Sequence, residues 1–151
     1  MRLVVGADHR GYCLKNTVAD HLRAKGHDVL DVGTNDDTSV DYPDLALAVG
    51  SAIQHGEAER GLIVCGSGVG AVIAANKLRG VRAGICHDTY SAHQGVEHDD
   101  MNVVCIGARV VGEDLALEIV DAFVGAKFME EERYRRRLAK VKRLEEGAES
   151  L

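Results

Sequence analysis

The chain has 151 residues, 18 Lys and Arg against 24 Asp and Glu, and a formal net charge of −6 at pH 7. This length predicts one domain with a sizeable core, and a composition of 46% hydrophobic and 28% charged residues excludes disordered, collagen-like and disulfide-scaffold proteins. The acidic balance argues against nucleic-acid binding, which needs surplus Lys and Arg. No apolar run approaches the ~20 residues of a membrane span, and the N-terminus lacks a signal-peptide pattern, so we expect a cytoplasmic protein without membrane contact.

Short apolar segments alternate with longer helical patterns along the chain. The expected strands are residues 3–6, 28–32, 61–65, 82–86 and 103–107. Continuous apolar runs of this kind are typical of parallel strands covered on both faces. The expected helices are residues 11–25, 43–55, 68–78, 88–97 and 112–124. Five strand–helix units predict an α/β fold, a three-layer α/β/α sandwich with right-handed crossovers.

A further, highly charged helix is expected after the last unit, over residues 129–144, within a C-terminal arm of residues 129–147. Its apolar residues are sparse: Leu138, Val141 and Leu144. We therefore expect it to lie over the body or to reach a partner subunit. Residues 1–151 are otherwise expected to form a single domain.

The four cysteines form no C-x-x-C pair and show no zinc-like spacing with histidine, so we expect reduced thiols and no metal. Cys65 ends a predicted strand and precedes a glycine-rich loop. It is either a buried strand cysteine or a base or nucleophile, since a helix N-terminus favours the thiolate. Cys13, Cys86 and Cys105 lack such a loop and are interpreted as packing residues.

Ligands of open parallel sheets bind beyond the carboxyl ends of the strands, where this chain has polar or glycine-rich segments. The loop of residues 66–70 follows a strand, and its N–H groups either bind an anion or reflect tight packing. Gly66, Gly68 and Ala71 also fit a dinucleotide pattern, with Asp88 about 20 residues further on. The chain leaves no room for a separate substrate domain, so an NAD-dependent oxidoreductase is a lesser alternative.

Other polar residues also have two interpretations. Asp8 either binds a sugar hydroxyl or caps the following helix. His98 is an acid or base, or an ordinary surface histidine. Arg133 and Arg137 lie one helical turn apart, as a phosphate clamp or as part of a solvated helix.

Taken together, these segments resemble one family over residues 3 to about 140. The matching motifs, in order, are Asp8-His9-x-Gly11, Gly33-Thr34, Ser39-Val40-Asp41-Tyr42-Pro43-Asp44, Cys65-Gly66-Ser67-Gly68-Val69-Gly70, Ala74-Ala75-Asn76-Lys77, Arg82-Ala83, Tyr90-Ser91-Ala92, Glu97-His98, Asn102-Val103, Gly107-x-Arg109-Val110-Val111-Gly112 and Arg133…Arg137. The chain resembles the ribose/galactose isomerase family, in particular its ribose-5-phosphate isomerase B type.

The resemblance implies a cofactor-free and metal-free aldose–ketose isomerase of a phosphorylated sugar, acting through an enediolate. It implies a Rossmann-like sandwich with strand order 2-1-3-5-4, and a homodimer or dimer of dimers with sites at the subunit interface. Ribose 5-phosphate and ribulose 5-phosphate are the expected substrates. The alternatives are D-erythrulose 4-phosphate and D-erythrose 4-phosphate, or a subunit like those of galactose-6-phosphate isomerase.

The same resemblance suggests roles for single residues. Cys65 matches the base that moves a proton between C1 and C2, and Ser67 with Gly66, Gly68, Val69 and Gly70 matches the cradle for the enediolate oxygens. Asp8 and His98 match groups that bind and open the sugar ring, with His98 reaching in from the partner subunit. The remaining matches are the phosphate ligands His9, Arg133 and Arg137, the substrate-binding Arg109, and Tyr42 in the pocket wall.

Three positions and one segment depart from the family pattern. Ser67 replaces a usual Thr, and Asp99, beside the site histidine, replaces a usual Asn whose amide could donate a hydrogen bond. Tyr134 stands where a phosphate-side histidine is common. Residues 86–91 resemble relatives that act on tetrulose phosphates. These positions lie in or near the expected pocket. The resemblance therefore predicts the reaction class, but it leaves open which sugar phosphate is the substrate.

Overall fold

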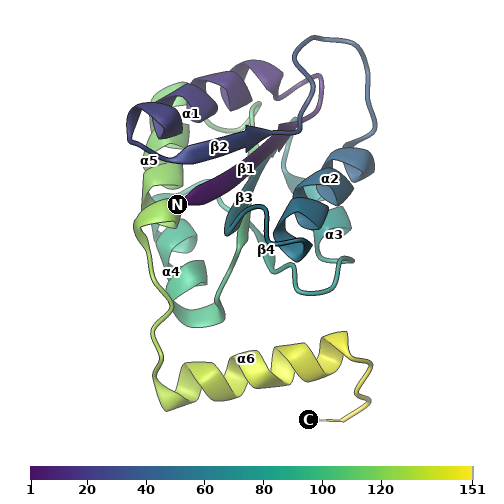
Figure 1. The fold of residues 1–151 in the computed structure, drawn as a ribbon, viewed down its shortest axis with the longest axis vertical. Helices are drawn as coiled ribbons and strands as arrows, with labels where there is room; N and C mark the ends of the chain where they lie inside the picture. The colour runs from purple at the N-terminus through teal and green to yellow at the C-terminus, as the bar shows by residue number, and fades with distance from the viewer. Residues whose placement is uncertain (151) are drawn as a thin grey trace.

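The computed structural model describes residues 1–150 and contains one sheet of five parallel strands (Figure 1). The strands are β1 (Arg2–Ala7), β2 (Asp28–Asp31), β3 (Arg60–Cys65), β4 (Ala83–Ile85) and β5 (Val103–Gly107). Their order is β2-β1-β3-β5-β4, and every neighbouring pair is parallel. The structure therefore confirms the expected sheet and strand order.

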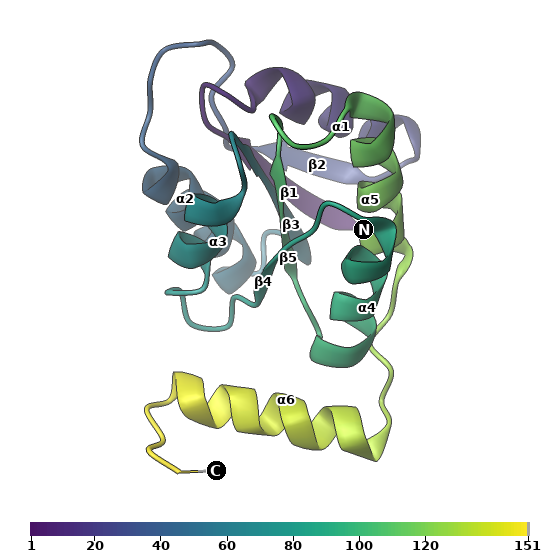
Figure 2. The ribbon, with the colours of Figure 1, turned by 180° about the vertical axis from the view of Figure 1, so that it is seen from behind.

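Five helices cover the two faces of this sheet. They are α1 (Tyr12–Ala24), α2 (Tyr42–Gln54), α3 (Val69–Ala75), α4 (Thr89–Asp99) and α5 (Glu113–Gly125). Helices α1, α4 and α5 lie on one face and α2 and α3 on the other, as the two opposite views show (Figures 1 and 2). The expected α/β/α sandwich is thus confirmed.

The core consists of two apolar clusters, one on each side of the sheet. Leu3 and Val5 of β1 pack under α1 and α5, whereas Val4 between them packs under α2. Side chains of a strand alternate between faces, so a strand covered on both faces is apolar at every position. This explains why β1, β3 and β5 read as apolar runs, whereas β2 at the sheet edge alternates between exposed and half-buried positions.

Two of the expected details are wrong. Helix α3 ends at Ala75 rather than at residue 78, because the Asn76 side chain bonds both the N–H and the carbonyl of Ala83 and turns the chain into β4. Cys13, expected as a packing residue, is exposed, because it lies on the solvent side of α1. The buried side of that helix carries Val18, Ala19 and Leu22.

A sixth helix, α6 (Glu132–Glu145), crosses the foot of the molecule beyond an extended connection (Figure 1). Only Tyr134 and Leu138 of α6 are buried, while Val141 and Leu144 remain 47% and 54% exposed. The arm therefore packs loosely on its own chain. None of the helices in residues 1–150 is both long and apolar enough to cross a membrane.

The turn between β1 and α1 packs directly against the backbone of β3. Gly11 is the N-cap of α1, and a Cβ at this position would lie 2.2 Å from the carbonyl oxygen of Val64. Because the obstacle is backbone rather than a flexible side chain, the two segments can approach this closely only with glycine. This contact holds the start of α1 next to Cys65.

We predict that Gly11→Ala destabilises the protein by about 1–3 kcal/mol, because the added methyl group forces β3 and α1 apart. Thermal unfolding measures the change. The matched control is Gly125→Ala, at the end of α5, where a Cβ meets nothing within 4 Å. An unchanged melting temperature for Gly11→Ala would show that this contact does not constrain the turn.

Candidate active site

The parallel register brings the carboxyl ends of β1, β3 and β5 to one edge of the sheet. Ala7 pairs with Val64, and Cys65 pairs with Gly107. The N–H of Asp8 donates to the Val64 carbonyl at 3.2 Å, and the N–H of Ala108 donates to the Cys65 carbonyl at 2.8 Å. The residues that follow these three strands therefore form one continuous surface.

Asp8 is the buried carboxylate of this surface, with 7% of its area exposed. Its Oδ1 accepts hydrogen bonds from the N–H groups of Arg10 at 2.9 Å and Gly11 at 3.1 Å. The N-cap of α1 is Gly11, so Asp8 orders the turn before the helix rather than capping the helix itself. Both hydrogen bonds end on the same carboxylate oxygen.

Cys65 lies against the glycine-rich loop, as expected. Its Sγ accepts a hydrogen bond from the N–H of Gly68 at 3.1 Å, and its side chain is buried. Gly68 has a φ of +84°, in the left-handed region that favours glycine, and this conformation directs its N–H toward the sulfur. Ser67 is exposed, and its Oγ accepts from the N–H of Val69 at 3.3 Å.

Burial disfavours the thiolate form of the other two buried cysteines, Cys86 and Cys105. Burial raises the pKa of Cys86 to about 11 and raises the pKa of Cys105 further still. A thiol with a raised pKa stays protonated and is a poor nucleophile. These two residues fit their expected packing role, and the candidate base is Cys65.

Tyr42, His9 and Arg109 lie on the same carboxyl edge. A Cβ at Gly70 would lie 2.7 Å from Cζ of Tyr42, so the tyrosine ring rests on the glycine loop. Nδ1 of His9 accepts a hydrogen bond from the N–H of Val40 at 3.3 Å. The N–H of Arg109 donates to the Gly66 carbonyl at 3.1 Å. The carboxyl edge of one chain thus brings together most of the site residues that the resemblance predicts for a single copy.

Two polar residues at this edge had no role in the sequence analysis. Lys15 of α1 is fully buried, and its Nζ donates to Asp31 Oδ2 at 2.6 Å and to Asn35 Oδ1 at 2.9 Å. It anchors the segment that leads to Tyr42. His87 accepts the N–H of Gly107 on Nε2 at 3.0 Å, which continues the pairing of β5 beyond the end of β4.

Asp88, the acidic residue of the dinucleotide pattern, is occupied as the N-cap of α4. Its two oxygens accept from the N–H and the hydroxyl of Ser91 at 2.7 and 2.9 Å. These hydrogen bonds hold the pKa of Asp88 below its ordinary value. Asp88 thus has the structural role of a helix cap, which accounts for its presence without the NAD interpretation. Within residues 1–150, no three His, Cys, Asp or Glu side chains form a metal-binding group.

The remaining expected site residues lie at the opposite end of the fold. Helix α4 begins at the carboxyl edge and runs back along the sheet for 11 residues, which is about 16 Å. His98 and Asp99 are its last two residues. A single chain therefore does not bring His98 to Cys65.

His98 forms a cluster with the start of α6. Its Nδ1 pairs with Gln94 Nε2 at 2.7 Å, its Nε2 pairs with the Tyr134 hydroxyl at 2.9 Å, and its ring stacks on Tyr134 with 4.2 Å between centroids. The Arg133 guanidinium donates to the same hydroxyl at 2.7 Å and lies 4.5 Å above the tyrosine ring. The cluster holds Arg133 beside His98, with Arg137 one helical turn further along α6.

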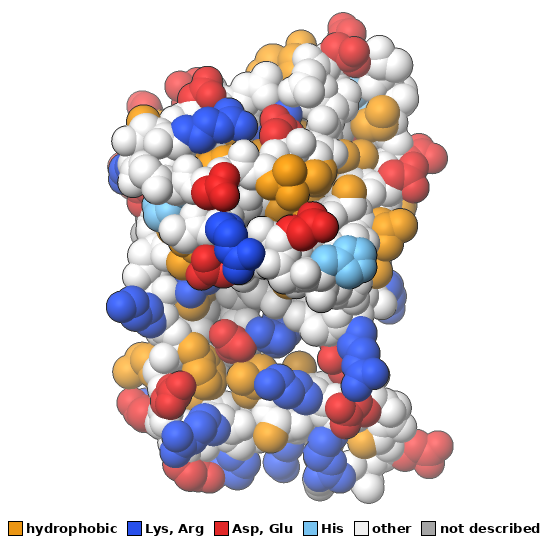
Figure 3. Space-filling view, viewed as in Figure 1, with side chains coloured by type: hydrophobic (Ala, Val, Ile, Leu, Met, Phe, Trp, Pro, Cys, Tyr) orange, Lys and Arg blue, Asp and Glu red, His pale blue; other side chains and the backbone are white. Residues whose placement is uncertain are grey.

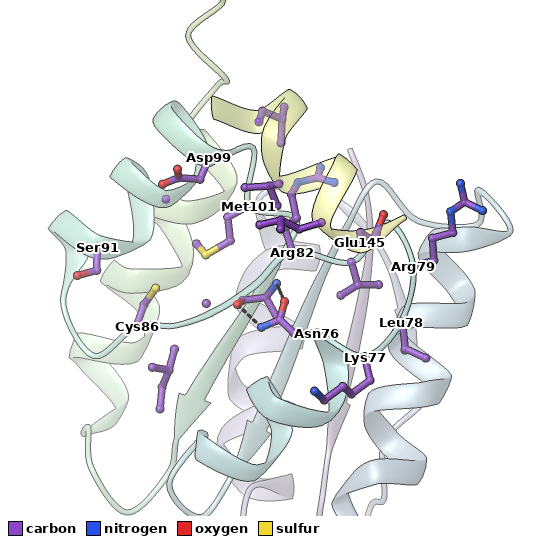
Figure 4. Close-up of a pocket in the computed structure, with 18 residues that line it drawn as sticks. Asn76, Lys77, Leu78, Arg79, Arg82, Cys86, Ser91, Asp99, Met101 and Glu145 are labelled. Atoms are coloured by element: carbon purple, nitrogen blue, oxygen red, sulfur yellow. Dashed lines mark hydrogen bonds between the residues drawn. The ribbon is translucent and has the colours of Figure 1, made fainter. Parts of the chain in front are cut away.

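A groove of about 780 Å³ lies between α6, the end of α3, the free edge of β4 and α4 (Figure 4). Its walls include the apolar side chains of Ile85, Met101, Leu138, Val141 and Leu144, together with Asp99. Cys65 and Ser67 do not line it. The groove is separate from the carboxyl-edge site and leaves an apolar sheet edge uncovered.

Comparison with known proteins shows which family this chain is similar to. A model of the family described as Ribose/Galactose Isomerase matches residues 3–141. The chain is 41% identical over 145 residues to ribose-5-phosphate isomerase B of Escherichia coli (strain K12), covering 96% of this chain and 97% of that protein. It is 42% identical over 130 residues to D-erythrulose-4-phosphate isomerase of Pectobacterium atrosepticum, covering 85% of each.

Solved structures agree with these sequence matches. Ribose-5-phosphate isomerase B of Clostridium thermocellum superposes with a TM-score of 0.95 at 45% identity, covering 97% of this chain and 99% of that one. The enzyme of Mycoplasma genitalium with bound ribulose-5-phosphate superposes with a TM-score of 0.91 at 35% identity, covering 97% of both.

The hydrogen bonds of Asp8 predict different effects for two substitutions. Asp8→Asn retains an Oδ1 acceptor for the N–H groups of Arg10 and Gly11, so its thermal stability stays close to that of the unmodified chain. Asp8→Ala leaves these N–H groups without that acceptor and costs about 1–3 kcal/mol. Equal melting temperatures for the two variants would contradict the assigned role of Asp8 in the turn.

Proposed function

The chain belongs to the ribose/galactose isomerase family, and we propose that it interconverts ribose 5-phosphate and ribulose 5-phosphate with Cys65 as the base. The observation that carries this proposal is the Gly68 N–H bond to Cys65 Sγ, which places the thiol against the glycine loop and beside the strand end that carries Asp8. Sugar-phosphate isomerisation is the reaction of the relatives.

The proposed mechanism starts with opening of the sugar ring by Asp8 and by His98 of a second copy. Cys65 as thiolate then removes the proton from C2 of the aldose, and the electron pair forms an enediolate between C1 and C2. The hydroxyl proton moves from O2 to O1, and return of the carbon proton from the Cys65 thiol to C1 gives the ketose and regenerates the thiolate. The loop of residues 66–70 and the Ser67 hydroxyl donate hydrogen bonds to the enediolate oxygens. A positioned base contributes ~10²–10⁴ in rate, and one oxyanion donor a further ~10²–10³.

We further propose that the complete site forms between two copies of the chain, as a homodimer or within a dimer of dimers. One copy supplies Cys65, Asp8, His9, Tyr42 and Arg109, and the other supplies His98, Asp99, Arg133 and Arg137. The opposite ends of α4 place these groups too far apart within one chain, whereas a two-fold axis brings the foot of one copy to the carboxyl edge of the other.

Charge and exposure support this arrangement. Helix α6 carries seven basic and two acidic side chains in a chain with a net charge of −6, and basic groups gather over it at the foot of the molecule (Figure 3). Val69 and Ile73, one turn apart on α3, are 51% and 58% exposed, and Ile85 at the end of β4 is 38% exposed. An apolar edge and a basic arm are complementary to a second copy of this acidic chain.

A second candidate substrate is D-erythrulose 4-phosphate. The observations that favour it are Ser67 and Asp99 in place of the usual Thr and Asn, the segment of residues 86–91, and the D-erythrulose-4-phosphate isomerase at 42% identity. A subunit resembling those of galactose-6-phosphate isomerase is a further alternative. All four cysteines are free thiols, which a reducing compartment preserves, so we place the enzyme in the cytoplasm.

The substrate proposal predicts a higher kcat/KM for ribose 5-phosphate than for D-erythrulose 4-phosphate when both are assayed side by side. A preference of ~10²-fold or more for the tetrose, about 2.7 kcal/mol of transition-state discrimination, would transfer the assignment to the tetrose phosphate. Failure to isomerise any sugar phosphate would refute the proposed function as a whole.

The proposed base predicts that Cys65→Ala lowers kcat by ~10²–10⁴ while KM changes only a few-fold, because the thiol moves a proton and does not hold the phosphate. Steady-state kinetics test this. Cys13→Ala, at an exposed position on α1, is the matched control and retains full activity. A Cys65→Ala variant with most of its kcat would show that another group is the base.

A further inference from the structure

Arg10, which follows the site residues Asp8 and His9, is not assigned a role by the resemblance or by the proposed mechanism. Its backbone N–H is fixed by Asp8, and its side chain is exposed at the carboxyl edge. A Cβ placed on Gly66 would lie 3.3 Å from Cδ of Arg10 and 4.0 Å from Cδ of Arg109. The stems of the two arginines therefore flank the same glycine, directly after Cys65.

Arg10 differs from most arginines of this chain because its side chain has no hydrogen bond or ion pair within residues 1–150. Nine of the 12 arginines have a side-chain hydrogen bond or ion pair within residues 1–150. The three arginines without one in these residues are Arg10, Arg109 and Arg137. Two of these are the expected substrate and phosphate ligands, and Arg10 is the third.

The side chains of Arg10 and Arg109 both reach Gly66, and neither guanidinium has a carboxylate partner within residues 1–150, so a bound anion would neutralise two positive charges at this part of the edge. A phosphate dianion fits the pair well, since each guanidinium can donate two parallel hydrogen bonds to its oxygens. Arg109 is anchored through its backbone to Gly66 and Arg10 through its backbone to Asp8. The pair is thus built on two of the fixed turns of the carboxyl edge.

We propose that Arg10 is a further phosphate-binding residue, which pairs with Arg109 over Gly66 to hold the phosphate group of the substrate. The proposal rests on the proposed function for the identity of the substrate. The pair belongs to a single chain, so it contributes phosphate affinity from the same copy that supplies Cys65. Arg133 and Arg137 of the second copy would then complete the charge around the phosphate.

The test compares Arg10→Met with Arg10→Lys and with Arg23→Met. Arg23 lies in the last turn of α1, at the far end from the site, and its removal changes the net charge equally. Isothermal titration with inorganic phosphate measures binding directly, and steady-state kinetics measure KM and kcat for ribose 5-phosphate. Melting temperatures verify that the variants are folded.

We expect Arg10→Met to weaken phosphate binding and raise KM by about tenfold, with a much smaller change in kcat, and Arg10→Lys to restore part of the affinity. The effect of Arg10→Met shrinks as salt is added, because an exposed charge is screened. Arg23→Met leaves both quantities unchanged.

Equal phosphate affinity and KM in Arg10→Met and the unmodified protein would overturn the proposal while leaving the isomerase function intact. A fall in kcat without a change in phosphate affinity would also overturn it, since Arg10 would then act on the reacting carbons. If the unmodified protein isomerised no sugar phosphate, the proposed function would fail, and the titration with inorganic phosphate would still decide the role of Arg10.

Discussion

The common direction of the five strands is the constraint on which the rest of this structure depends. Because all strands are parallel, every strand-to-helix turn lies at one edge, and every covering helix must return to the other. The first consequence is a surface where Asp8, Cys65 and Arg109 meet. The second is that His98, at the end of α4, lies at the opposite edge. The geometry that gathers Asp8, Cys65 and Arg109 thus keeps His98 away from them within one chain.

Two close backbone contacts fix the geometry of the turns at this carboxyl edge. Gly11 lets the first turn touch the Val64 carbonyl, and Gly68 turns its N–H onto the sulfur of Cys65. The buried Cys86, by contrast, has a raised pKa and contributes packing. Of the buried cysteines, Cys65 is thus the one whose sulfur accepts a hydrogen bond from the glycine loop.

The parallel sheet was predictable from five apolar runs separated by helical patterns, whereas the strand order was predicted only through the family resemblance. The ends of the helices were less predictable from the sequence. Helix α3 ends early because the Asn76 side chain forms a hydrogen bond with Ala83 of β4, seven residues further along the chain. Lys15 was predictable in principle, because it occupies the first position of the buried stripe completed by Val18, Ala19 and Leu22. The pairing of Arg10 with Arg109 was not, because it joins the ends of two different strands.

The most direct test of the proposal that two copies share the site is complementation between the Cys65→Ala and His98→Ala variants. When Cys65→Ala and His98→Ala chains are unfolded together and refolded in equal amounts, half of the dimers contain one of each chain. In such a dimer one site carries both substitutions and the other carries neither, so the mixture should recover about a quarter of the unmodified isomerase activity. A mixture no more active than the separate variants would show that Cys65 and His98 act within one chain, or that one of them is not required.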